Sequence, residues 1–370
     1  MTKRIEISPK VPPTRNKKGR KEIVLDVAIM STMSSSNVAV YTTPPESLIK
    51  HLEPHLPYSL PLIRRLRFAQ LFKGGITKNT RIVYVTSVTA ENDEEEQERD
   101  DGGGGSGEDN EVPFAAGYLD FSRGPETELW IYSSLERAAA GGKDAETVTE
   151  EAEVGSRERE ATACALALLR EVKRQQDLYF GPPDSQRARE RVYPTLLVGN
   201  LGESLRLRLA DPATGVVFTT TGIYDKWLFT INDLPDIKLP SPPPSSSGEG
   251  EWSWGMAKVE DIPFMLSRSH IERKVRTMKL LASTVLYCNG KPIAWAFLGP
   301  DSSLSSLHCE EPYRGKGIAK AVAIKILRDH LKEYGNESPG YGWADVDPAN
   351  TQSQGVCRSL RGQVRWQISW

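Results

Sequence analysis

The chain has 370 residues and a formal net charge of −2, so its length predicts two domains or one double-sized unit. The near-neutral charge provides no global field that would favour nucleic acid as a partner. The four cysteines show no C-x-x-C spacing, which argues against a zinc ribbon or a disulfide framework and favours a reducing compartment.

The N-terminus is basic and contains no apolar stretch of the kind found in a signal peptide. Residues 1–22 are therefore interpreted as a disordered, solvated tail, with a nuclear address as the alternative reading of the basic cluster. No run of 18 apolar residues occurs, so no membrane span is expected. The expected location is the cytoplasm, with the nucleus as the alternative.

Residues 23–240 are predicted to form an N-terminal half that mixes strands and helices. The segment 47–71 is predicted to be partly helical and interrupted by prolines, and 160–178 is predicted to be a helix. The predicted strands are 81–88, a hairpin of 114–121 and 128–133, and then 195–198, 216–221 and 227–231.

Three low-complexity segments divide the chain. Residues 91–111 are acidic and then glycine-rich, which predicts a mobile insertion because they cannot bury apolar surface. Residues 138–159 are rich in Ala, Gly and Glu, and they form either a loop or additional turns of the helix that follows. Residues 241–251 are rich in Pro and Ser and are interpreted as a semi-extended linker between two halves.

The C-terminal part, residues 252–370, contains stronger local signals. Asn289-Gly290 is the strongest short turn signal and predicts a hairpin over 283–298. The segment 304–309 is predicted to be a strand, 317–335 an amphipathic helix and 341–346 another strand. A turn at 347–350, a helix and a final strand complete the predicted order.

The loop between the strand 304–309 and the helix 317–335 reads Arg314-Gly315-Lys316-Gly317-Ile318-Ala319. Glycines allow backbone N–H groups to approach a phosphate, and a helix start adds unpaired donors and partial positive charge. These features predict a pyrophosphate cradle. The loop matches neither the dinucleotide nor the nucleoside triphosphate pattern. The alternative is a glycine-rich turn that binds no ligand.

The pattern R-x-x-G-x-A in this loop resembles the acyl-CoA loop of the GNAT superfamily of N-acetyltransferases. Over residues 252–370 the resemblance is to the glycine N-acyltransferase-like branch, because of the segment Asn289 to Trp295, the motif Asn350-x-x-Ser353 and the C-terminal tryptophans. It implies an α+β fold with a mixed, mostly antiparallel sheet flanked by helices. The order of the N-terminal half suggests a degenerate GNAT-like copy without CoA, and the alternative is an unrelated α+β domain.

The resemblance also implies which residues bind acetyl-CoA or another acyl-CoA as cosubstrate. Main-chain groups of the strand 304–309 would pair with the pantetheine, and the loop would hold the pyrophosphate. The residues implied are Leu307, Cys309, Arg314, Gly315, Lys316, Gly317, Ile318, Ala319, Asn350 and Ser353. No metal is expected.

Proton transfer is less clearly assigned. His308 and Glu310 are the base candidates, against the alternatives of a packed core histidine and a solvated carboxylate. The branch has an acidic residue where this chain has Ser303, and many members have a tyrosine where it has Cys357. Both departures weaken the catalytic assignment. Arg268 and Arg273 precede the hairpin 283–298, and they are candidates for binding a carboxylate on the acceptor.

Three functions remain open. The first is an N-acyltransferase that uses a short acyl-CoA on a small amine or amino acid. The second is a protein acetyltransferase that acts on N-termini or lysines, which would make a protein the acceptor. The third is a CoA-binding pseudoenzyme that serves as a scaffold. Neither nucleic acid nor a membrane is expected as a partner.

Overall fold

The computed structural model describes residues 36–88, 112–137, 148–191, 195–219, 221–244, 250–269, 271, 273–335 and 340–370, without the side chains of 148–154. The tail predicted at 1–22 and the insertion predicted at 91–111 lie outside the described residues. So do 138–147 and 245–249, which belong to the other two low-complexity segments. Within the described part, no helix has the length and apolar character needed to cross a membrane.

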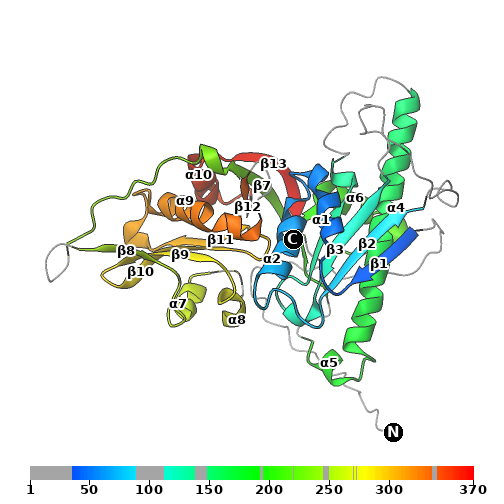
Figure 1. Cartoon of the computed structure of the whole chain (residues 1–370), viewed down its shortest axis with the longest axis horizontal. Coiled ribbons are helices and arrows are strands. Elements are labelled where there is room, and N and C mark those ends of the chain that lie inside the picture. The colour runs from blue at the N-terminus through cyan, green and yellow to red at the C-terminus, as the bar shows by residue number, and fades with distance from the viewer. Residues whose placement is uncertain are drawn as a thin grey trace, which may run out of the picture.

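The N-terminal half begins with a strand and two helices, continues with three strands and a long helix, and ends with a short broken strand, a helix and a last strand (Figure 1). Its elements are β1 (Ser36–Tyr41), α1 (Glu46–Leu52), η1 (Glu53–His55), α2 (Leu60–Leu71), β2 (Arg81–Ser87), β3 (Phe114–Leu119), η2 (Phe121–Arg123), β4 (Leu129–Ser133), α4 (Val148–Phe180), α5 (Gln186–Arg189), β5 (Val198–Gly199), β6 (Leu201–Gly202), α6 (Glu203–Leu209), η3 (Pro212–Thr214), β7 (Ile223–Thr230) and η4 (Ile231–Asp233).

The first sheet has the strand order β1-β2-β3-β4-β5 and is covered by helices on both faces. Alternate residues of a strand point to opposite faces, so Val83 and Val85 of β2 pack in the core formed with α4, whereas Ile82 packs in the core formed with α1 and α2. Every residue of β3 is buried, as expected for a central strand between two helical layers. The strands β4 and β5 are parallel, and the other pairs are antiparallel.

The C-terminal half repeats the same order of elements. Its elements are β8 (Trp252–Gly255), α7 (Ile262–Ser267), α8 (Val275–Met278), β9 (Ser283–Cys288), β10 (Lys291–Leu298), β11 (Leu304–Cys309), η5 (Glu311–Tyr313), α9 (Ile318–His330), η6 (Leu331–Tyr334), β12 (Tyr341–Val346), α10 (Thr351–Ser359) and β13 (Gln363–Ser369). The second sheet has the antiparallel order β11-β10-β9-β8.

The two halves exchange their last strands in a third sheet of order β12-β7-β13-β6. Strand β7 of the N-terminal half pairs antiparallel with both β12 and β13, and β13 reaches back to β6. Figure 1 shows β7 and β13 in the middle of the molecule, between the two halves. The predicted α+β class is therefore confirmed, and the repeated order confirms two copies of one fold.

A buried ion pair lies in the exchanged sheet. Lys226 of β7 is only 1% exposed, and its Nζ lies 2.7 Å from Oδ1 of Asp345 on β12. The same Nζ donates to the side-chain oxygen of Asn200 and lies 3.5 Å from the centroid of the Trp343 ring. Trp370 donates to the other carboxylate oxygen of Asp345 at 3.0 Å. Residues from both halves therefore satisfy these buried charges.

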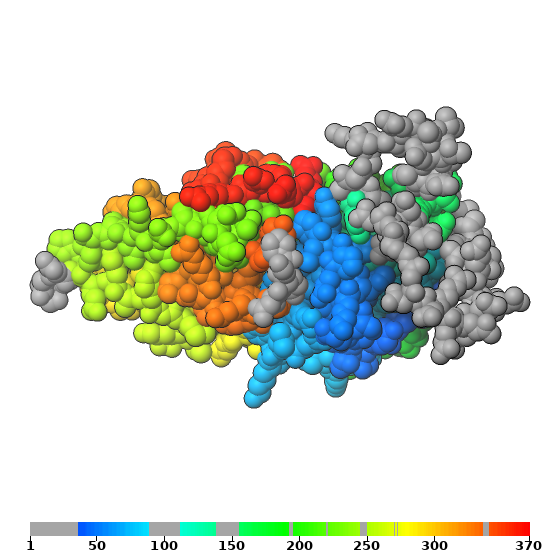
Figure 2. All heavy atoms as spheres, turned by 45° about the horizontal axis from the view of Figure 1, so that its top comes forward, coloured from blue at the N-terminus to red at the C-terminus, as the bar shows by residue number. Residues whose placement is uncertain are grey.

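Helix α2 joins the halves on another side. Arg64 donates through Nη1 to the carbonyl oxygens of Leu331 and Gly335, at 3.0 and 2.9 Å. Phe68 stacks on Tyr334 with ring centroids 5.9 Å apart. Figure 2 shows the blue N-terminal residues against the orange segment that contains α9. The halves are thus held together by packing and hydrogen bonds as well as by the shared sheet.

Most predicted elements are present, and two predictions need correction. The predicted strand 216–221 is wrong, because Val216 is buried and Val217 is half exposed but the described residues form only an isolated bridge at Val217. Apart from this bridge, the described residues of the segment pack without strand pairing. The predicted strand 195–198 is also wrong in its bounds, because β5 comprises only Val198 and Gly199, and Asn200, with φ +56°, separates it from β6.

Candidate active site

The loop from Arg314 to Gly317 leads from β11 to α9, and its two glycines have left-handed backbones. φ is +75° at Gly315 and +79° at Gly317, and a Cβ added at either position would meet open space. Residues with a Cβ pay about 1–2 kcal/mol for this conformation. Gly317 is the N-cap of α9 and has no side-chain cap, so the first N–H groups of the helix face an exposed loop without intrahelical partners.

The side chains of the loop leave this helix start open. Arg314 donates through Nε to the carbonyl oxygen of Cys309 at 2.9 Å, and Lys316 donates through Nζ to that of Pro312 at 3.0 Å. Both side chains are exposed, whereas Ile318 is buried beneath the helix. Ala319 is partly buried and packs against the core. The loop is therefore exposed and carries two cations next to the open start of α9.

Strand β11 carries a bulge at its centre. Its pairing with β10 shifts so that Ser306 and Leu307 lie opposite the single residue Ala296. Ser306 has φ +52°, which is unfavourable for a residue with a Cβ. A bulge removes main-chain groups from the ladder and redirects side chains, and such features are frequent beside active sites.

Among the described strands, none pairs with the outer edge of β11, because β12 belongs to the exchanged sheet. Glu310 donates its backbone N–H inward to Ile293 at 2.9 Å. Since main-chain groups alternate along a strand, those of Cys309 point to the outer edge, whereas Leu307 lies in the bulge. The bond from Arg314 to the Cys309 carbonyl agrees with this direction. An unpaired edge inside the fold is suited to an extended ligand with amide groups.

The two predicted base candidates lie in contact. His308 Nε2 lies 3.1 Å from Glu310 Oε1, and that oxygen also accepts from Nε of Arg268 at 3.0 Å. The His308 ring stacks on Trp295 with centroids 4.5 Å apart. His308 is thus a partly packed ring with one polar partner, and Glu310 is an ion-paired carboxylate. Arg268, predicted as an acceptor ligand, is already occupied by that carboxylate.

Burial lowers the pKa of His308 below its usual value near 6.5, and the hydrogen bond to Glu310 partly offsets this. The ring is therefore neutral at pH 7, as a proton acceptor must be.

We expect Glu310→Gln to lower the pKa of His308 further, because the variant removes the carboxylate that favours the imidazolium. Titration of the ring by NMR would measure the shift, with Glu333→Gln, beside His330, as the control. An unchanged or higher midpoint for His308 would contradict the contact.

Arg273, the second predicted acceptor ligand, lies near the other end of β11. It donates through Nη2 to Ser305 Oγ at 2.7 Å, and its Nε is buried without a hydrogen-bond partner in the described part of the chain. Burial lowers the pKa of Arg273, and the nearby Glu126 and Asp301 oppose this. Its position beside the bulge leaves it available for an anionic group.

Asn350 and Ser353 form the start of α10. The side chain of Asn350 caps the helix by accepting from the backbone N–H of Ser353 at 3.0 Å. Helix α10 contacts α9 and β12.

Cys357, at the position of the missing tyrosine, is 3% exposed, and burial raises the pKa of its thiol to about 12. Burial likewise raises the pKa of Cys309 to about 11, so both thiols stay protonated at neutral pH.

Several residues around the site were not identified from the sequence. Ser305 and the bulge at Ser306 have no local sequence signal, because a register shift depends on the partner strand. Asp301, which is 2% exposed and accepts from Trp130 Nε1 at 3.1 Å, joins the halves next to β11. The described residues contain no group of three or more His, Cys, Asp or Glu suited to a metal ion.

The two halves differ in strand pairing, because β11 and β12 of the C-terminal half lie in different sheets. In the N-terminal half, the equivalent strands β4 and β5 are paired, through Leu129 with Val198 and Trp130 with Gly199. Glu136, just beyond β4, is buried, and burial raises its pKa to about 8. The absence of a CoA loop there stays a prediction, since residues 138–147 lie outside the described part.

Comparison with known proteins gives one family match. A family model for the acyl-CoA N-acyltransferase verG N-terminal domain matches residues 35–227, which is just over half of the chain. The match covers the N-terminal half, whereas the sequence resemblance was found over 252–370. No curated protein matches the sequence.

The solved structures that match this chain are distant in sequence. A Drosophila protein has 12% identity and a TM-score of 0.49, with 88% of this chain and 94% of that chain covered. A tandem GNAT protein from the clavulanic acid biosynthesis pathway has 10% identity and a TM-score of 0.44, with 90% and 97% covered.

Proposed function

The chain belongs to the acyl-CoA N-acyltransferases that carry a verG N-terminal domain, and from this membership we propose that it transfers an acetyl or other short acyl group from coenzyme A to the amine of a small molecule or amino acid. The observation that supports a CoA site in the C-terminal half is the open start of α9 beside the unpaired edge of β11.

The residues of this site fit the chemistry of coenzyme A. Gly315 and Gly317 leave space for a pyrophosphate at the helix start, and Arg314 and Lys316 supply positive charge. The outward main-chain groups of Cys309 and the main-chain groups of Leu307 in the bulge are proposed as partners for the amides of pantetheine. Asn350 and Ser353, at the start of α10, are proposed to lie near its far end. Bound acyl-CoA supplies an activated thioester carbonyl.

In the proposed reaction, the protein aligns the acceptor amine and removes its proton. Alignment alone can contribute several kcal/mol. An α-amino group, with a pKa near 7.8, requires about 1 kcal/mol for deprotonation at pH 7, whereas a lysine amine requires about 4–5 kcal/mol. His308, neutral at pH 7 and held by Glu310, is proposed as the proton acceptor. Arg273 is proposed to bind an anionic group of the acceptor.

The proposal is tested with the purified full chain. We expect CoA to bind one-to-one in calorimetry, and we expect thiol release from acetyl-CoA when the twenty amino acids and simple alkylamines are supplied as acceptors. No CoA binding would contradict the site. Transfer only to peptides would favour a protein acetyltransferase, and tight binding without any transfer would favour a pseudoenzyme.

A further inference from the structure

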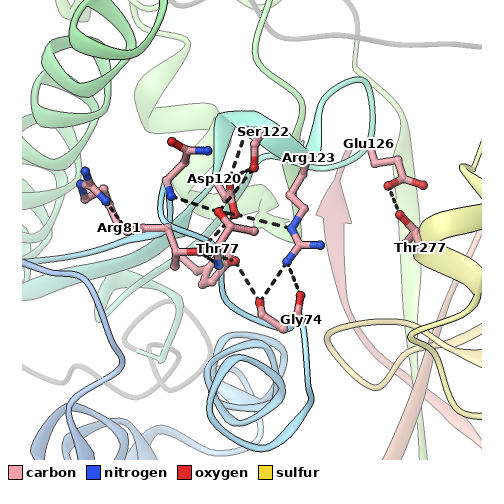
Figure 3. Close-up of polar contacts among 12 residues, drawn as sticks. Gly74, Thr77, Arg81, Asp120, Ser122, Arg123, Glu126 and Thr277 are labelled. Atoms are coloured by element: carbon pink, nitrogen blue, oxygen red, sulfur yellow. Dashed lines mark hydrogen bonds and ion pairs between the residues drawn. The ribbon is translucent and has the colours of Figure 1, made fainter.

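A turn of the N-terminal half packs against the segment that borders β11 in the C-terminal half. The turn comprises residues 120–126, between β3 and β4, and we call it the clamp turn. The segment comprises α7, α8 and the residues between them, 262–278, of which 270 and 272 lie outside the described residues. We call it the acceptor-side segment. Figure 3 shows the two meeting at Glu126 and Thr277.

The clamp turn is rigid because it is built around a buried carboxylate. Asp120 is fully buried and accepts hydrogen bonds from three hydroxyls and one backbone N–H (Figure 3). The donors are Ser122 Oγ at 2.6 Å, Thr77 Oγ1 at 2.8 Å, Ser122 N at 3.0 Å and Thr80 Oγ1 at 3.1 Å. Arg123 also ties the turn to the carbonyls of Gly74 and Gly75, at 2.8 and 3.1 Å. A satisfied buried network fixes one conformation.

The clamp turn holds the beginning of α8. Glu126 Oε1 accepts from the backbone N–H of Lys274 at 2.8 Å, and Oε2 accepts from Thr277 Oγ1 at 2.5 Å. Arg276 donates to the carbonyl oxygen of Ser122 at 2.9 Å. Lys274 is the N-cap of α8, and its side chain makes no capping hydrogen bond. The carboxylate of Glu126 therefore caps a helix that belongs to the other half of the chain.

The acceptor-side segment also contacts β11 and the residue that follows it. Arg268 pairs with Glu310 at one end of the strand, and Arg273 bonds Ser305 beside the bulge. A cavity of about 340 Å³ lies between the clamp turn and this segment. Its walls include Pro125 and Glu126 from one half and Leu266, Ser269, Ile271 and Arg273 from the other. The clamp turn therefore forms one wall of a cavity that is linked to β11 through Arg273, which lines the cavity and bonds Ser305.

We propose that Glu126 is a positioning residue for acyl transfer, and that the cavity it borders receives the amine acceptor. By fixing Lys274 and Thr277, Glu126 holds Arg273 against β11 and maintains the shape of the cavity. In the N-terminal half β4 and β5 are paired, whereas the equivalent strands β11 and β12 of the C-terminal half are not. Through Glu126, the N-terminal half thus contributes to acceptor binding. The inference rests on the proposed function, because the cavity has a role only if an acceptor meets a thioester at β11.

The test compares Glu126→Ala, Glu126→Gln and Thr277→Val in the full chain. Alanine removes both hydrogen bonds, whereas glutamine can accept from Lys274 N and donate to Thr277 Oγ1, so it rescues the contact without the charge. Thr277→Val removes one bond with little change in shape. Glu260→Gln, at an exposed position before α7, is the matched control.

We expect amide hydrogen exchange in residues 273–279 to rise about tenfold in Glu126→Ala, as the loss of one or two hydrogen bonds implies, and to return towards wild type in Glu126→Gln. The affinity of Glu126→Ala for acetyl-CoA should stay within about twofold of the wild-type value. Its KM for the amino acid that the wild-type protein acylates fastest should rise by a larger factor than its kcat falls. Unchanged exchange in Glu126→Ala, or no rescue by glutamine, would overturn the positioning role. If the wild-type protein does not bind CoA, the proposed function is overturned instead.

Discussion

Replacing Gly317 with aspartate is expected to weaken binding of coenzyme A by about 100-fold. The variant places a carboxylate at the exposed start of α9, where the proposed pyrophosphate would lie, and it forces a Cβ into a left-handed backbone. Loss of one or two charge-assisted hydrogen bonds, each about 1.5–3 kcal/mol, accounts for this size. Calorimetric titration with CoA measures the change, and Arg314→Ala should weaken binding about tenfold for the same reason.

The matched control for this prediction is Gly290→Asp. Gly290 has φ +74° and open space around its Cβ position, as Gly317 has, but it lies in the turn between β9 and β10. It therefore reproduces the backbone strain and the added charge without touching the loop. Equal CoA affinity in Gly317→Asp and wild type, or an equal loss in both glycine variants, would refute the assignment of the loop.

Replacing Lys226 with methionine is expected to destabilise the protein by about 3–5 kcal/mol, because it leaves the carboxylate of Asp345, whose side chain is only 10% exposed, without its cation. This is a large part of the total of about 5–15 kcal/mol typical of folded proteins. The midpoint of urea unfolding measures the effect, and Lys238→Met, at an exposed position, is the control. A loss below about 1 kcal/mol would show that the pair does not support the exchanged sheet.

The pH dependence of the Lys226→Met variant has a defined sign. Burial already raises the pKa of Asp345, and loss of Lys226 removes the partner that opposes this. A folded state with a raised carboxyl pKa binds a proton more readily than the unfolded chain does, so stability rises as pH falls. The deficit relative to wild type should therefore be smaller at pH 5 than at pH 8.

Local signals in the sequence predicted local structure well. Asn289 and Gly290 have φ +50° and +74°, as a tight hairpin turn requires, and the predicted strands 304–309 and 341–346 match β11 and β12. The helix after the glycine loop begins at Ile318 because the left-handed Gly317 ends the loop there. Each of these features is determined by residues within a few positions of one another.

Features that depend on distant partners were not predicted. The strand β7 was expected to belong to the N-terminal half, but its neighbours β12 and β13 come from the other end of the chain. The pair of Lys226 and Asp345 and the contact of Glu126 with Thr277 likewise join residues far apart in sequence, for which composition and periodicity give no signal. The contact between His308 and Glu310 was foreseeable, because alternate residues of a strand share a face.

The exchange of β7 and β13 means that neither half is a self-sufficient folding piece. A fragment ending at residue 240 would carry β7 with both hydrogen-bonding edges exposed, and a fragment beginning at residue 252 would leave a slot one strand wide between β12 and β13. Open strand edges of this kind promote aggregation. Expressed together, however, the two fragments would each offer what the other lacks, so the protein is built like a covalently tethered heterodimer.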